Sequence, residues 1–355
     1  MGIKRLLPLI KIAVSIISVG VSFASHVYMA DLFAEEQVCA APAEFQKGMC
    51  YVSWEKDTYE SSYSDRSIES LAKIGTNWIS ILTTYYQKDV ASPRIYPTEK
   101  TPRDSSLKHA IKRAHELGLK VMLKPHVDPI DTSGGQWRGD IFFYNEEDWK
   151  VWFHDYRVFI THYARLAEES GVDMLCIGTE LSATIDRKDA WIEIIREVRK
   201  IYKGRLTYAA NWNNEFENIE FWDELDYAGV DAYFPLAKND NPSLDELKAA
   251  WEACVEKIES WANGLGRPVI FTEVGYPSAS TAAIAPWQYN TPGSPDMKIQ
   301  EKCYRALLET VWNKQWLAGI YWWNWNANPD AGGPYDKSFT VQNKPAQNLL
   351  ARWYK

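Results

Sequence analysis

Short apolar runs alternate with amphipathic stretches from residue 47 to the end of the chain. Several runs are continuously apolar, as expected of strands that are buried on both faces of a parallel sheet. The pattern predicts eight strands, at 48–54, 77–85, 120–127, 174–178, 206–212, 227–233, 269–273 and 318–325.

Between these strands, apolar side chains recur every three or four positions, which is the spacing of a helix that covers a sheet. Asp104 or Ser105 is the expected N-cap of one helix, and Asn145 is that of a longer one. Ser243 with Glu246 forms the S-x-x-E pattern of a capping box. The predicted helices cover 68–73, 107–117, 146–169, 191–202, 244–263 and 298–313.

Repeated βα units without a Pro-rich or low-complexity spacer predict a single (β/α)8 TIM barrel of the α/β class. The 355 residues fit one such barrel, and a hydrophobic share of 46% is enough for a large core. The longest loops, 128–145 and 277–296, follow the carboxyl ends of strands. Such barrels build their active sites at that end.

The N-terminus has the composition of a secretory signal. A basic start precedes a largely apolar run, and the small side chains of Ser22 and Ala24 suit cleavage. We expect a signal peptide, or an uncleaved membrane anchor, at 1–24, a linker at 25–46 and the catalytic domain at 47–355. The protein is therefore expected to be secreted or associated with the cell envelope, with membrane contact only through that first segment.

Composition and motifs exclude several classes of function. The net charge of −8 opposes binding to nucleic acid. The five cysteines are scattered without CxxC or histidine pairing, which predicts neither a disulfide framework nor a zinc site, although a bridge between Cys39 and Cys50 stays open. No P-loop or Rossmann fingerprint is present. We therefore expect a monomer with no metal, no cofactor and no nucleic-acid partner.

Two glutamates each directly end a predicted strand. Glu180 ends the fourth strand and Glu273 the seventh, so closing the barrel brings both to the same rim. Two carboxyl groups can cleave a glycosidic bond, because one protonates the leaving oxygen while the other attacks or stabilises an oxocarbenium-like centre. Asp231 or Asp128 takes the place of Glu273 if the strand register differs.

Four short motifs carry a resemblance to a known family: Lys124-Pro-His126-Val-Asp128, Trp137-Arg138-Gly139, Ile177-Gly-Thr-Glu180-Leu and Thr272-Glu273-Val-Gly-Tyr276. With them, the chain from about residue 48 onward resembles clan A of the glycoside hydrolases. Within that clan it is most similar to glycoside hydrolase family 113, which contains β-mannanases.

This resemblance implies retaining, double-displacement hydrolysis of β-1,4-linked mannan or manno-oligosaccharides, with Glu180 as acid/base and Glu273 as nucleophile. It also implies that Tyr233 orients the nucleophile. The wider clan commonly has Asn before the acid/base, where this chain has Thr179. The 2-hydroxyl of mannose is axial, so a changed partner there is consistent with a mannoside. Asn211 or Asn213 is an alternative donor to that hydroxyl.

Other side chains at predicted strand ends or in long loops are expected to bind the glycan. Aromatic rings suit the C–H faces of sugars, and His126 is the only histidine at a predicted strand end. Alternation along the eighth strand predicts that Trp323 and Trp325 share one face. The substrate-binding candidates are Trp54, Lys124, His126, Asp128, Trp137, Arg138, Thr179, Asn211, Trp212, Asn213, Asp231, Tyr233, Trp323 and Trp325.

The sequence leaves two alternatives open. One is a hydrolase of another β-linked glycan, since a fold and a catalytic pair do not fix the sugar. The other is a carbohydrate-binding barrel without turnover. Activity across a panel of polysaccharides separates these readings, and the choice between endo and exo action also stays open.

Overall fold

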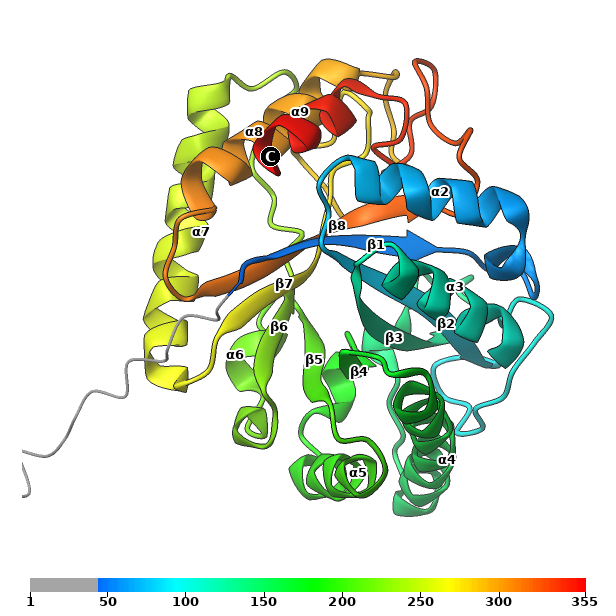
Figure 1. The fold of residues 1–355 in the computed structure, drawn as a ribbon. Coiled ribbons are helices and arrows are strands. Elements are labelled where there is room, and N and C mark those ends of the chain that lie inside the picture. The colour runs from blue at the N-terminus through cyan, green and yellow to red at the C-terminus, as the bar shows by residue number, and fades with distance from the viewer. Residues whose placement is uncertain (1–43) are drawn as a thin grey trace, which may run out of the picture. The chain divides into compact units, whose positions relative to one another are not determined.

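Eight parallel strands close into a barrel in chain order, with β1 beside β8, in the computed structural model, which describes residues 44–355 (Figure 1). Every predicted strand is present, so the predicted (β/α)8 TIM barrel is confirmed. The strands are β1 (Gln46–Val52), β2 (Trp78–Gln87), β3 (Lys120–Pro129), β4 (Met174–Thr179), β5 (Arg205–Asn211), β6 (Tyr227–Asp231), β7 (Val269–Val274) and β8 (Leu317–Asn326).

Helices surround this sheet on its outer side (Figure 1). The α-helices are α2 (Ser62–Lys73), α3 (Asp104–Glu116), α4 (Glu146–Ser170), α5 (Lys188–Ile201), α6 (Glu215–Asn218), α7 (Leu244–Leu265), α8 (Met297–Val311) and α9 (Pro345–Trp353). Short 3-10 turns lie in the loops: η1 (Thr58–Glu60), η2 (Arg138–Asp140), η3 (Ser182–Thr184) and η4 (Trp222–Glu224).

All predicted helix ends except the start of α2 lie within three residues of the observed ends, whereas α6 and α9 were not predicted. The Asn145 side chain accepts from Asp148 N, and the predicted capping box at Ser243 is present. The N-cap of α3 is Arg103, not Asp104 or Ser105, because the helix already includes both of those residues. Helix α2 begins at residue 62 rather than 68, since its first turn is polar and gives no apolar periodicity.

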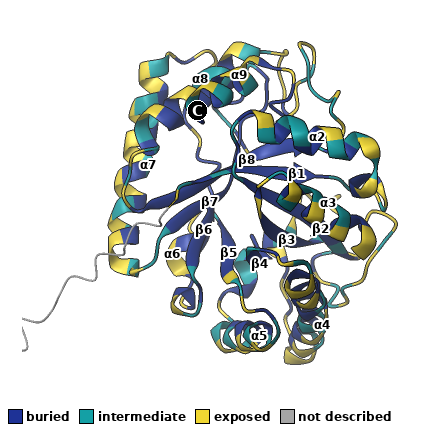
Figure 2. Cartoon of the chain, in the orientation of Figure 1, coloured by how far each residue is buried: buried dark blue, intermediate teal, exposed yellow. Residues whose placement is uncertain are grey.

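The core has two layers. One apolar cluster fills the space between the sheet and the helices, and a second fills the barrel interior with side chains such as Cys50, Met122 and Ile270. Figure 2 shows the strands as buried and the outer faces of the helices as exposed. The sheet is therefore covered on both faces, which explains its continuously apolar strands.

Some predictions fall outside the described residues. The segment 1–24 and Cys39 precede residue 44, so the signal or anchor, the export of the protein and the Cys39–Cys50 bridge stay predictions. Strand β1 begins at Gln46, next to the predicted start of the barrel. Among residues 44–355, none of the helices has the length and apolar character needed to cross a membrane.

Candidate active site

The carboxyl ends of the strands bring the predicted charged side chains to one rim of the barrel. In the parallel register, Asn211 of β5 lies beside Asp231 of β6, which in turn lies beside Glu273 of β7. Glu180 directly follows the last residue of β4. The negative charge of Glu273 raises the pKa of Glu180, so the two glutamates lie close enough to share one site.

Glu180 lies in a nearly buried position with two polar neighbours. Its Oε1 accepts a hydrogen bond from Asn211 Nδ2 (2.7 Å), and Arg138 Nη1 lies 3.5 Å from its Oε2. Burial raises the pKa of Glu180 to about 7; the negative charge of Glu273 acts in the same direction, whereas Arg138 and Asn211 oppose it. A carboxyl with this pKa is partly protonated at neutral pH, as a general acid must be.

Glu273 faces a cation and a hydroxyl. Lys124 Nζ lies 2.5 Å from its Oε1, and the Tyr233 hydroxyl donates to its Oε2 (2.7 Å). His126 Nε2 lies 3.9 Å from Oε1, and the pKa of His126 is well below its ordinary value because of burial and the nearby cations Arg138 and Lys124. A neutral imidazole therefore lies beside a carboxylate whose two oxygens are both engaged.

Lys124 and Asp231 form the floor of this site. Both side chains are fully buried, and Lys124 Nζ lies 3.2 Å from Asp231 Oδ1, which also accepts from Thr272 Oγ1 (2.7 Å). Burial raises the pKa of Asp231, and the charge of Glu273 raises it further. Both side chains are fully buried and contact each other, and Lys124 also contacts Glu273, whereas their predicted contact with substrate stays a prediction.

The loop after β3 supplies a second cation. Arg138 bonds to Asp128 Oδ1 through Nε (2.8 Å) and Nη2 (2.7 Å), which directs the rest of its guanidinium toward Glu180. The Trp137 ring folds over Gly139, where an added Cβ would overlap it. The Trp-Arg-Gly motif thus combines a loop anchor with a positive charge that is held beside Glu180.

The two candidate tryptophans of β8, Trp323 and Trp325, lie on opposite faces of the sheet. Trp323 belongs to the interior cluster with Tyr233, whereas Trp325 lies in the outer core, where its Nε1 donates to Ser67 Oγ on α2 (2.9 Å). The register with β1 slips by one residue between Trp322 and Trp325, so a bulge reverses the alternation. The predicted shared face is wrong, and Trp325 is buried away from the rim.

The remaining candidates differ in exposure. Trp54 and Trp212 are partly buried and pack against the interior cluster. Asn213 is exposed in the loop after β5, and Thr179 is 2% exposed at the end of β4. Of the two asparagines, Asn211 is the one that contacts the acid/base candidate.

The loop after β7 adds two aromatic residues that sequence reasoning missed. Trp287 is 46% exposed and stacks on Trp212, with ring centroids 5.3 Å apart. Tyr289 is 62% exposed, and its ring packs against Phe339 (centroids 5.8 Å apart), which in turn contacts the ring of Tyr233 (6.2 Å). These residues lie in a loop without periodicity, so no sequence signal singles them out.

Sequence reasoning also missed Glu215. This glutamate follows two asparagines in a polar stretch, where an exposed side chain is the natural expectation. The structure places its carboxyl in the interior, 3% exposed, in contact with the residues that flank Glu180 and with Asn211.

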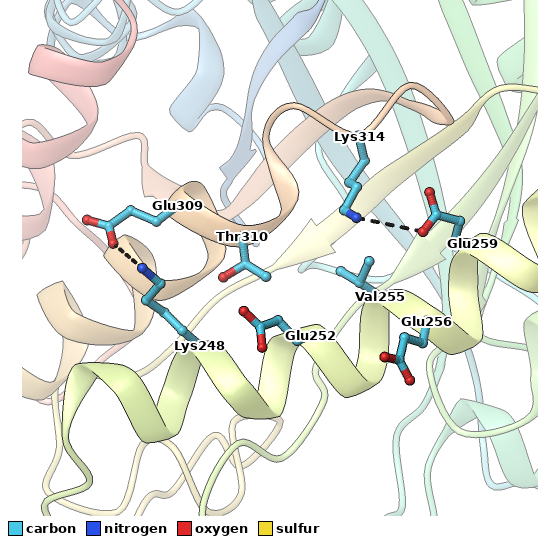
Figure 3. A pocket seen from close by; sticks show the side chains of 8 residues that line it. All are labelled: Lys248, Glu252, Val255, Glu256, Glu259, Glu309, Thr310 and Lys314. Carbon is cyan, nitrogen blue, oxygen red and sulfur yellow. Dashed lines mark hydrogen bonds and ion pairs between the residues drawn. The ribbon is translucent and has the colours of Figure 1, made fainter.

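A groove on the outer surface, between α7 and α8, is lined largely by charged side chains (Figure 3). Lys248 bonds to Glu309 (2.9 Å), and Lys314 pairs with Glu259 (3.7 Å). The groove is therefore a salt-bridged helix contact rather than a second active site. Within residues 44–355, no cluster of three or more His, Cys, Asp or Glu could hold a metal ion.

Comparison with known proteins assigns this rim to an enzyme family. The family model for Glycoside Hydrolase Family 113 matches residues 49–344, whereas no curated protein matches. Similar solved structures include a complex of a GH113 β-1,4-mannanase, with 26% identity and a TM-score of 0.79 over 88% of this chain and 99% of that one. The GH113 β-mannanase AaManA from Alicyclobacillus acidocaldarius, in complex with ManMIm, has 30% identity and a TM-score of 0.79 over 88% and 97%.

More distant structures share the fold alone. A β-glucuronidase from Ruminococcus gnavus has 12% identity and a TM-score of 0.59, over 88% of this chain and 50% of its own. The family match covers most of the barrel and includes both rim glutamates and the motifs around them. The chain belongs to Glycoside Hydrolase Family 113 and is a glycoside hydrolase.

Proposed function

We propose that the protein hydrolyses β-1,4-mannosidic linkages in mannan or manno-oligosaccharides by double displacement, with Glu180 as acid/base and Glu273 as nucleophile. The observation that carries this proposal is the contrast between the two carboxyl groups. Burial raises the pKa of Glu180 to about 7, whereas Glu273 meets Lys124 Nζ at 2.5 Å. One group is suited to hold a proton and the other to carry a negative charge.

In the first step, a Glu273 oxygen attacks the anomeric carbon while Glu180 gives its proton to the leaving oxygen. The Tyr233 hydroxyl, 2.7 Å from Glu273 Oε2, holds the carboxylate in one orientation. Lys124 Nζ contacts Oε1 and balances its charge. The products are a glycosyl ester on Glu273 and a free leaving-group alcohol.

In the second step, Glu180 acts as a base. The ester has no negative charge, so one of the influences that raise the pKa of Glu180 is lost and its proton is more readily released. The Glu180 carboxylate then takes a proton from water, which attacks the anomeric carbon and releases Glu273. Two inversions at this carbon give net retention.

Two side chains at the site support sugar binding. His126 is 3% exposed, and its Nε2 has no hydrogen-bond partner among residues 44–355, so a sugar hydroxyl can satisfy it. Trp323 presents an indole beside Tyr233 on the interior side of the rim, where it suits an apolar sugar face. The choice of mannan rests on the two mannanase structures, which share 26% and 30% identity with this chain.

The first experiment measures reducing sugars released from linear β-1,4-mannan, with cellulose, xylan and galactan in parallel. We expect release from mannan by the wild type and none by Glu273→Ala. The control is Glu217→Ala, which removes an exposed side chain that pairs with Lys257. If the wild type releases reducing sugars from another polymer instead, that polymer replaces mannan as the proposed substrate. If the folded wild type binds a polymer but releases no sugar, the proposed catalysis is contradicted.

Azide then separates the roles of the two glutamates. With an activated aryl mannoside, azide should rescue Glu273→Ala and give the inverted glycosyl azide. It should rescue Glu180→Ala with the retained azide, because Glu273 still forms the covalent intermediate. The opposite pairing of products would exchange the two assignments.

A further inference from the structure

Glu215 is a buried carboxyl outside the pair that performs the reaction. It opens α6, a helix of four residues after β5, and is 3% exposed. Glu217 on the same helix is exposed, so burial at 215 is a property of this position and not of the whole helix.

Three donors from two segments meet this carboxyl. Its Oε1 accepts from the Tyr208 hydroxyl (2.6 Å) on β5. Its Oε2 accepts from Ser182 Oγ (2.8 Å), in the loop after β4, and from the Asn211 backbone N–H (2.7 Å) at the end of β5. Glu215 thus joins the ends of two neighbouring strands of the barrel.

Each of these contacts leads to Glu180. The Tyr208 hydroxyl accepts a hydrogen bond from the backbone N–H of Leu181 (3.0 Å). Leu181 and Ser182 are the two residues that directly follow Glu180 in the chain. Asn211 Nδ2 donates to Glu180 Oε1 (2.7 Å). The Glu215 carboxyl therefore fixes both the backbone after the acid/base and the side chain that hydrogen-bonds to it.

Glu180 needs such support because its backbone is strained. Its φ is +51°, in the left-handed region. This conformation costs a residue other than glycine about 1–3 kcal/mol, so it persists only where neighbouring contacts hold the backbone in place. On one side, the Glu180 N–H donates to Ala209 O (2.8 Å). On the other side, the contacts of Leu181 and Ser182 run through Tyr208 and Glu215.

We propose that Glu215 is a positioning residue, whose carboxyl holds Leu181, Ser182 and Asn211 so that the Glu180 carboxyl is directed at the leaving-group oxygen. This inference rests on the proposed function, because it assigns the acid role to Glu180. Glu215 itself does not touch the reacting atoms.

The electrostatics agree with a role beyond packing. Burial raises the pKa of Glu215 to about 7, although three hydrogen bonds oppose the change. Ionising this carboxyl therefore destabilises the folded protein at neutral pH. An apolar side chain of similar size would avoid that cost, but it could not accept from Tyr208, Ser182 and Asn211.

The test compares substrates that differ only in their need for an acid. A dinitrophenyl β-mannoside loses a good leaving group without protonation, whereas a phenyl β-mannoside needs the proton. We measure kcat/KM, which reports the first displacement, for the wild type, Glu215→Ala, Glu215→Gln and Glu217→Ala. Circular dichroism and thermal unfolding establish that each variant is folded.

Glu215→Ala should lower kcat/KM on the phenyl mannoside by about 10-fold to 100-fold, within the range of a general acid, and on the dinitrophenyl mannoside by less than about 3-fold. Glu215→Gln retains a carbonyl acceptor for Ser182 and Asn211 and should recover part of the loss. Glu217→Ala should leave the ratio of the two substrates unchanged.

An equal loss on both substrates by folded Glu215→Ala would show a merely structural role and overturn the inference. If that variant does not fold, Tyr208→Phe removes one contact and the link to Leu181, and the same unequal loss is expected. A wild type that cleaves neither these mannosides nor linear β-1,4-mannan refutes the proposed sugar instead. The ratio is then measured on aryl glycosides of the sugar that the wild type does cleave.

Discussion

Removing the positive charge of Arg138 should move the pH dependence of the enzyme upward. Arg138 Nη1 lies 3.5 Å from Glu180 Oε2, and its charge lowers the pKa of Glu180 against the effect of burial. In Arg138→Ala this opposition is lost, so Glu180 retains its proton to higher pH. Because the protonated acid is the active form, the alkaline limb of kcat/KM should move to higher pH.

The distance sets an upper limit on the size of this effect. Two unit charges 3.5 Å apart interact by about 5 kcal/mol at an effective dielectric constant of about 20, which would correspond to about three and a half pH units. Both side chains are partly exposed, at 18% and 12%, and water that enters the space left by Arg138 stabilises the carboxylate. We therefore expect a movement of about one pH unit, from about 7 to about 8.

The assay follows kcat/KM on a phenyl mannoside between acid and alkaline pH, since this ratio reports the ionisation of the free enzyme. Arg138→Lys keeps the charge and should keep the limb close to that of the wild type. Arg157→Ala removes an exposed arginine that pairs with Glu193 (3.2 Å) and should leave the limb in place. If the alkaline limb of kcat/KM for Arg138→Ala stays at the wild-type pH or moves to lower pH, the electrostatic argument is refuted.

Two buried groups give predictions about stability. Lys124→Met leaves the carboxyls of Asp231 and Glu273 without their shared cation and should cost about 3–5 kcal/mol in urea unfolding. Adding Asp231→Asn to that chain should recover part of the loss, and a double variant no more stable than the single one would contradict the pairing. Glu215 has a pKa raised from 4.5 to about 7 in the folded state, so the folded protein binds this proton more tightly than the unfolded chain. Its stabilising contribution is complete below about pH 4.5 and is lost as pH rises to about 7, by up to about 3 kcal/mol. The free energy of unfolding of Glu215→Gln, measured at acid and at neutral pH, should lack this part of the pH dependence. A pH dependence equal to that of the wild type would contradict the assignment to Glu215.

The fold could be predicted because its signal is periodic. Strands that are covered on both faces leave apolar runs, and the helices between them repeat at helical spacing, so the order of elements follows from the pattern. Helix α6 and the first turn of α2 escaped prediction because they are short or polar, and the C-terminal helix α9 was also not predicted. Alternation failed at Trp325 because a bulge in β8 inserts one residue, which no periodicity reveals.

The candidate site could be predicted only in part. Residues at strand ends, such as Glu180 and Asn211, are located by counting strands, and the structure brings them to one rim. The depth of a side chain in the barrel is not encoded in that count. Lys124 was therefore assigned to the substrate although it is fully buried. Glu215 was missed because its burial depends on contacts with Ser182, which is 33 residues away, and with Tyr208 across the turn after β5, and neither contact leaves a periodic pattern.

In the proposed mechanism, the division of labour between the two glutamates rests on an unequal placement of two cations. Lys124 Nζ lies 2.5 Å from Glu273, whereas Arg138 Nη1 lies 3.5 Å from Glu180 and also serves Asp128. The closer and more deeply buried cation lies beside Glu273, and the negative charge of Glu273 adds to burial, which is the main cause, in raising the pKa of Glu180. Moving positive charge from Glu273 toward Glu180 would thus weaken the nucleophile and the acid together. The roles of acid and nucleophile therefore depend on each other through one electrostatic arrangement.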